Sequence, residues 1–127
     1  MPALGKTIVV ALPVVDPRST WCERILDRVL EKAQALDITF DPEERLALEV
    51  RVFLTGHALS HSDVDNLLVA VMNGLQGQIG GQGKKIMHPG RRVIRNDRQV
   101  WRAQIEKAER PAGVVAEVGG HLTITCL

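Results

Sequence analysis

The chain has 127 residues, of which 45% are hydrophobic and 24% charged, a composition typical of one globular domain spanning residues 1–127. No apolar run approaches the ~20 residues of a membrane-spanning helix, and the first residues lack a secretory signal, so we expect no membrane segment and a cytoplasmic location. The net charge is only +1, but residues 84–102 carry 7 Lys and Arg against 1 Asp.

The first half of the chain predicts a strand, a helix and a second strand. The apolar segment Lys6–Leu12 predicts a strand that is buried on both faces or nearly so. Asp16 and Pro17 are typical of a helix start, and apolar residues then recur at helical spacing from Trp21 to about Ile38. Over Leu46–Leu54 apolar and other residues alternate, which predicts a strand with one face in water.

A second helix follows, with Asp65 expected as its N-cap and its end expected by Gly77. Its predicted buried stripe consists of Leu67, Leu68, Val71, Met72 and Leu75.

The last part of the chain predicts three strands. Val100–Lys107 forms the first, and the alternation of Trp101 with Ala103 and Ile105 favours a core position for the indole over a base-stacking one. Two further strands are expected to form a hairpin around Gly119-Gly120; they are Val114–Val118 and Leu122–Cys126. The order β-α-β-α-β-β-β therefore predicts an α+β fold: a mixed β-sheet with two helices packed on one side.

Two acids stand two residues apart where the second strand gives way to the second helix. Asp63 and Asp65 can serve one site if the helix begins at or after Asp65. Paired carboxylates repel unless a proton or cation lies between them, and Mg²⁺ prefers such hard oxygen ligands. The alternative needs no metal: Ser62 or Asp63 is the N-cap, and Asp65 is a first-turn acid that complements the helix dipole.

The basic block is the second candidate site. Arginine binds phosphate bidentately, so this block predicts contacts with nucleic acid, whereas a solvated loop face is the alternative. Its cations are Lys84, Lys85, Arg91, Arg92, Arg95, Arg98 and Arg102.

Two linked motifs resemble the RusA family of Holliday junction resolvases. The first is Asp63-Val-Asp65-Asn66-Leu67, followed by an apolar helix ending Asn73-Gly74-Leu75, and the second is Asn96-Asp97-Arg98-Gln99-Val100. The resemblance covers about residues 60 to 107. It implies a homodimeric endonuclease that uses Mg²⁺, held by Asp63, Asp65 and Asp97, to cut four-way DNA junctions in recombination and repair.

The chain departs from the family pattern at a position that bears on activity. The family has a catalytic lysine four residues after the second aspartate, where this sequence has Val69, and two further family acids are Asn73 and Asn96. An aliphatic side chain cannot stabilise charge on a reacting phosphate. Three interpretations therefore stay open: an active or attenuated nuclease, a junction-binding module that does not cut, and an α+β protein whose acids are caps and whose basic loop binds another anion.

Overall fold

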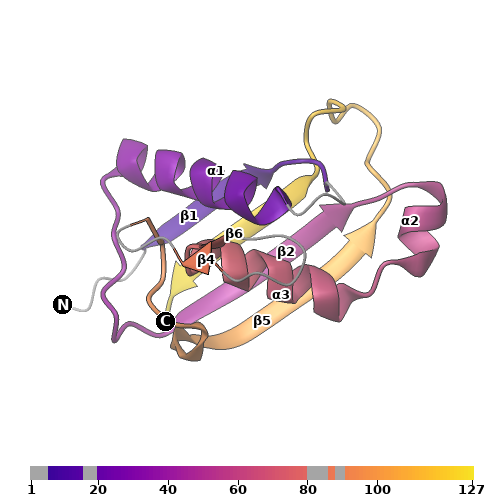
Figure 1. The fold of residues 1–127 in the computed structure, drawn as a ribbon. Helices are drawn as coiled ribbons and strands as arrows, with labels where there is room; N and C mark the ends of the chain where they lie inside the picture. Colours follow the sequence, from indigo (N-terminus) through magenta and orange to yellow (C-terminus); the bar gives the residue numbers. More distant parts are fainter. Residues whose placement is uncertain (1–5, 16–19, 80–85, 88–90) are drawn as a thin grey trace.

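A four-stranded mixed sheet organises the protein (Figure 1). The computed structural model describes residues 6–15, 20–79, 86–87 and 91–127. The strands lie in the order β1-β6-β2-β5, with β5 parallel to β2 and β6 antiparallel to both β1 and β2. The predicted α+β class with a mixed sheet is confirmed. The strand bounds are β1 Thr7–Leu12, β2 Leu46–Phe53, β5 Val100–Ala108 and β6 Gly120–Cys126.

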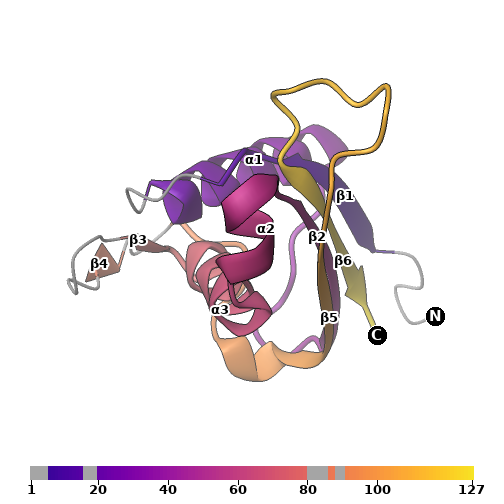
Figure 2. The ribbon, with the colours of Figure 1, turned by 90° about the vertical axis from the view of Figure 1, so that its right-hand side faces the viewer.

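The two long helices, α1 (Trp21–Leu36) and α3 (Val64–Leu75), pack on the same face of this sheet (Figure 2). The shorter elements are α2 Gly56–His61, the paired two-residue strands β3 Gln78–Ile79 and β4 Ile86–Met87, and the 3₁₀ turn η1 Asp97–Gln99. None of the helices in the described residues has the length and apolar character that crossing a membrane requires.

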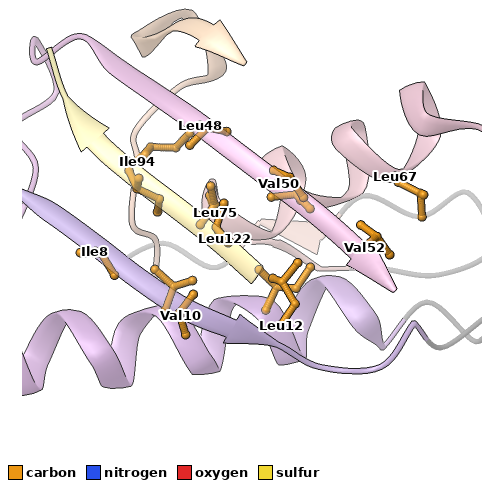
Figure 3. Packing of buried hydrophobic residues seen from close by; sticks show 14 of the residues in the cluster. Ile8, Val10, Leu12, Leu48, Val50, Val52, Leu67, Leu75, Ile94 and Leu122 are labelled. Carbon is orange, nitrogen blue, oxygen red and sulfur yellow. The ribbon is translucent and has the colours of Figure 1, made fainter. Parts of the chain in front are cut away.

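The core lies between the sheet and the two helices (Figure 3). Alternate residues of β2 point into it, as the period of a strand requires, and α3 contributes one stripe of its surface. Each fully buried aliphatic side chain contributes on the order of 2 kcal/mol through removal from water. Residues with no exposed surface include Ile8, Leu12, Ile25, Val29, Leu46, Leu48, Val52, Val71, Leu75, Leu122 and Ile124.

The first strand and helix differ from their predictions. β1 is an edge strand with only one face covered, so Val9 is 53% exposed and the expectation of burial on both faces is wrong. α1 begins at Trp21 with Thr20 at the N-cap position, later than the start predicted at Asp16. Asp16 and Pro17 lie outside the described residues.

The predicted C-terminal hairpin is also wrong. Residues 114–118 form a loop, and β6 runs between β1 and β2 instead of pairing with its own neighbour in sequence. Gly119 donates its N–H to the Leu12 carbonyl (2.8 Å), and its own carbonyl accepts from Phe53 N–H (3.0 Å). A Cβ at Gly119 would collide with the Pro13 backbone, so here glycine permits the close approach of two chains and makes no turn.

Candidate functional site at the two ends of β5

The first acidic pair lies where α3 begins. Asp63 occupies the N-cap position with extended backbone, and Asp65 is the second residue of the helix. The expectation that α3 begins at or after Asp65 is therefore wrong, and the alternative positions, Asp63 at the N-cap and Asp65 in the first turn, are confirmed. The Asp63 side chain makes no capping hydrogen bond. Both acids are exposed, and neither carboxylate has a hydrogen-bond or ion-pair partner among the described residues. The cap interpretation therefore leaves the Asp63 carboxylate unexplained.

A lysine that the motifs did not indicate lies beside this pair. Lys107 Nζ donates to the carbonyl of Ser62 at 2.9 Å, which brings the last part of β5 against the residue preceding Asp63. An ammonium group is thereby fixed at the residue that precedes Asp63 in the chain. No local spacing relates residue 107 to residue 62, so only the packing of β5 against the start of α3 could reveal this contact.

Asp97 lies in η1, directly before β5, on a turn that side chains hold in place. Asn96 Oδ1 accepts from Arg98 N–H at 2.9 Å, while Gln99 Oε1 accepts from Arg95 N–H at 2.8 Å, so the two amides cap the turn. Gln99 is 6% exposed. Two motif residues, Asn96 and Gln99, thus have structural roles, while the exposed Asp97 carboxylate has no partner in the described part of the chain.

The amide of Gln99 also joins this turn to a distant loop. Its Nε2 donates to the carbonyls of Asp41 (2.8 Å) and Glu44 (3.1 Å). All hydrogen-bonding groups of this buried amide are used. Breaking only some of these hydrogen bonds costs several kcal/mol, because the groups that remain lose their partners. The position of Asp97 is therefore set by the loop before β2 as well as by its own segment.

The structure does not bring the three aspartates together within one chain. Lys107 follows Val100 by seven residues, which at about 3.3 Å per residue separates them by roughly 23 Å. Asp97 lies before Val100 and Asp63 lies beside Lys107, so the two acids are at opposite ends of β5 (Figure 1). No three His, Cys, Asp or Glu residues in the described ranges could hold one metal ion.

The basic block follows α3 and leads to η1. The N–H groups of Val93 and Ile94 both donate to the Leu75 carbonyl, and Ile94 is buried, which ties this segment to the core. Arg91 forms an ion pair with Asp27 of α1, so part of its charge is already neutralised. The other arginines of the block, Arg92, Arg95, Arg98 and Arg102, are exposed. Its two lysines, Lys84 and Lys85, lie outside the described residues.

Val69 is 54% exposed on α3, one helical turn after Asp65. The position where the resembling family carries its lysine therefore faces solvent and not the core. Substitution by a longer side chain would meet no packing obstacle of the kind a buried position imposes.

Trp101 is 63% exposed, so its predicted place in the core is wrong. The pairing of β2 with β5 shifts at this point: Leu46 pairs with Val100 and Ala47 with Arg102, leaving Trp101 in a bulge. Because the bulge adds one residue, the alternation read from the sequence assigns the indole to the wrong environment. The Arg45 guanidinium carbon instead lies 4.2 Å from the centre of its ring.

A cluster of polar side chains around Glu44 stabilises the 41–44 loop, to which Gln99 is hydrogen-bonded. Cys126 Sγ donates to one Glu44 oxygen (2.8 Å) and Lys6 Nζ to the other (2.7 Å), and these two bonds lower the pKa of Glu44 to about 2. The same carboxylate raises the pKa of the Cys126 thiol. Polar side chains therefore stabilise the Asp97 end of β5, whereas no such contacts within the described ranges hold the acids at the start of α3.

No protein-family model and no curated protein sequence matches the chain.

Proposed function

We propose that this chain is a Mg²⁺-dependent endonuclease of the RusA kind that acts as a homodimer on four-way DNA junctions. The observation that carries the proposal is the set of three exposed carboxylates, Asp63, Asp65 and Asp97, on two linked motifs, each without a partner in the described residues. Exposed carboxylates without a structural role are suited to a ligand that brings positive charge. A DNA substrate makes the cytoplasm its proposed location.

The donor set suits Mg²⁺, provided a second copy completes it. Carboxylate oxygens are the hard ligands that this ion prefers, but one chain offers only Asp63 and Asp65 at one end of β5. β5 is the edge strand of the sheet, and two copies of an edge strand can pair antiparallel about a two-fold axis. Such pairing sets Asp97 of one subunit toward Asp63 of the partner subunit.

The sequence of β5 favours this arrangement electrostatically. With the two-fold axis at Gln104, Arg102 lies opposite Glu106 of the partner subunit, and the same contact repeats by symmetry. Opposite charges directly across a strand pair stabilise it, whereas like charges there would oppose it. The strand is therefore self-complementary in the register that joins opposite ends of the two copies.

Within such a site the protein groups have separable tasks. Mg²⁺, when bound, supplies Lewis-acid activation of the scissile phosphate. The Lys107 ammonium, fixed at the Ser62 carbonyl, offsets negative charge that develops close to Asp63. The exposed arginines of the basic block hold the DNA backbone through phosphate contacts.

A junction-binding module that does not cut is the second candidate, and Val69 favours it. An exposed aliphatic side chain one turn beyond Asp65 supplies no cation where the resembling family has one. Val69→Lys separates the two candidates, since a cation near the forming charge is worth about 3 kcal/mol, or about a hundredfold in rate. No gain in cutting, with folding and binding intact, would favour the binding module.

Nicking of a synthetic four-way junction in Mg²⁺, compared with EDTA, tests the proposal directly. The wild-type chain should nick symmetric strands only in Mg²⁺, and Asp65→Asn should abolish nicking while DNA binding remains. Glu117→Gln is the matched control, because it removes one exposed acid from the loop after β5. Equal nicking by wild type and Asp65→Asn would overturn the assignment of Asp65.

A further inference from the structure

The two tryptophans of the chain have opposite environments. Trp21 is 3% exposed, and its indole N–H donates to the Pro13 carbonyl at 2.8 Å. Trp101 is 63% exposed, although removing an indole from water is among the largest hydrophobic gains available to a side chain. Tryptophan is enriched at binding interfaces, and this ring is presented to solvent at a bulge next to the candidate site.

Arg45 holds the exposed ring in a defined setting. Its guanidinium carbon lies 4.2 Å from the ring centre, within the distance of a cation–π contact. The guanidinium covers one face of the indole, and the large exposed fraction leaves the opposite face open to solvent. A planar group can therefore stack on the free face without displacing Arg45.

The surroundings of the ring contain the polar groups that a nucleotide needs. Trp101 and Arg45 border a hollow of about 290 Å³, which Asn96 and Arg98 also line. Its acids are Glu43 and Glu44, and the second of these is already bound by Lys6. The cations near the ring therefore come from η1 and β5: Arg98 precedes Trp101 in sequence and Arg102 follows it.

We propose that Trp101, backed by Arg45, is a stacking platform for an unpaired DNA base. The inference rests on the proposed function, because a four-way junction presents bases at its centre that can leave the stack more readily than those inside a duplex. Stacking on an aromatic ring is tolerant of sequence, since every base has a π face, and Arg98 lies where it can contact the adjoining phosphate. Base capture would occur at the start of β5, directly after the turn that carries Asp97.

Intrinsic fluorescence tests the platform. In a Trp21→Phe chain, Trp101 is the sole tryptophan. Its emission should be quenched by a single-stranded oligonucleotide and by a four-way junction, but far less by a blunt duplex of equal charge. In a Trp101→Phe chain, the emission of buried Trp21 should not respond to any of the three.

Affinity measurements on the otherwise intact chain do not depend on the folding of the Trp21 variant. Trp101→Ala should weaken junction binding by about tenfold, while Trp101→Phe retains most of the affinity because it keeps a ring. The dependence of affinity on salt should be equal in both variants, since phosphate contacts remain. Arg98→Ala should instead lower the salt dependence.

Three outcomes would overturn the platform. Unchanged junction affinity in Trp101→Ala, with no quenching in the single-tryptophan chain, removes Trp101 from the DNA surface, while Mg²⁺-dependent nicking would still support the proposed function. An affinity loss accompanied by dissociation of a dimer, seen by sedimentation, makes Trp101 a contact between two copies. Absence of quenching by single strands, junctions and duplexes alike excludes base stacking altogether.

Discussion

The two ends of β5 both carry acids of the linked motifs, but the hydrogen bonds around these acids differ. At the Asp97 end, Asn96 and Gln99 cap the turn, and Gln99 reaches the carbonyls of the 41–44 loop. At the Asp63 end, the N-cap carboxylate makes no capping bond, and Lys107 donates to the neighbouring Ser62 carbonyl. Both ends therefore carry carboxylates without partners among the described residues, but only at the Asp97 end do side-chain hydrogen bonds cap the segment that carries the acid. Functional residues are often not optimised for folding.

The largest expected effect comes from substitutions at the two ends of β5, made in separate chains that are then mixed. Asp65→Asn and Asp97→Asn should each lower nicking by at least ~100-fold, because each removes a ligand charge from both sites of a dimer. When the two variants are mixed and allowed to exchange subunits, half of the dimers contain both variants. Each mixed dimer then has one intact site, so nicking should recover to about a quarter of the wild-type rate.

The same mixture shows whether the site is shared. If all three aspartates act within one subunit, every site in the mixed dimers lacks a carboxylate and no activity returns. Subunit exchange is checked by mass spectrometry of differently tagged chains. An exchanged but inactive mixture would contradict the proposed pairing of β5 edges.

Gln99→Ala should cost the most stability at the Asp97 end. The substitution leaves the carbonyls of Asp41 and Glu44 and the N–H of Arg95 without the amide, so we expect a loss of about 2–3 kcal/mol in the free energy of unfolding. Urea denaturation followed by circular dichroism measures it. Arg98→Ala, on the same turn but exposed, is the control and should change stability by less than ~0.5 kcal/mol.

Capping should differ between the two ends by a smaller amount. Asn96→Ala removes an acceptor that Arg98 N–H uses, and the loss should be about 1 kcal/mol. Asp63→Ala removes an N-cap side chain that makes no such bond, so its effect on unfolding should stay within about 0.5 kcal/mol. Equal losses in the two variants would show that Asp63 does cap α3 in solution.

A further effect concerns pH and Glu44, which supports the loop beneath the Asp97 end. Its pKa is lowered from the ordinary 4.5 to about 2 by the Cys126 thiol and Lys6, so the folded state binds fewer protons than the unfolded state in this range. The resulting stabilisation is fully present above pH 4.5 and is lost as the pH falls toward 2. Unfolding measured from pH 6 to pH 2.5 should show this loss in the wild type and not in Glu44→Gln.

The elements themselves followed from local spacing. Apolar residues at the helical period predicted α1 and α3, and alternation predicted β2, because the backbone geometry of each element fixes which neighbours share a face. The start of α3 was misplaced by two residues, since Asp63 and Asp65 are both suitable cap types and only the fold selects between them. The α+β class follows from such local patterns alone.

The spacing of residues along the sequence could not predict contacts between distant segments. Gly119-Gly120 resembles a hairpin turn in sequence, yet it lets β6 enter between β1 and β2, an order that depends on which strands bury the most surface together. Trp101 is exposed, and not in the core as the alternation predicted, because the register between β2 and β5 shifts by one residue. The sequence by itself determined α1, α3 and the four strands of the main sheet, whose patterns are local, but not the short helix α2. The tertiary structure alone decided that Asp97 and Asp63 lie at opposite ends of β5, because strand length and the packing of Lys107 against Ser62 set that separation.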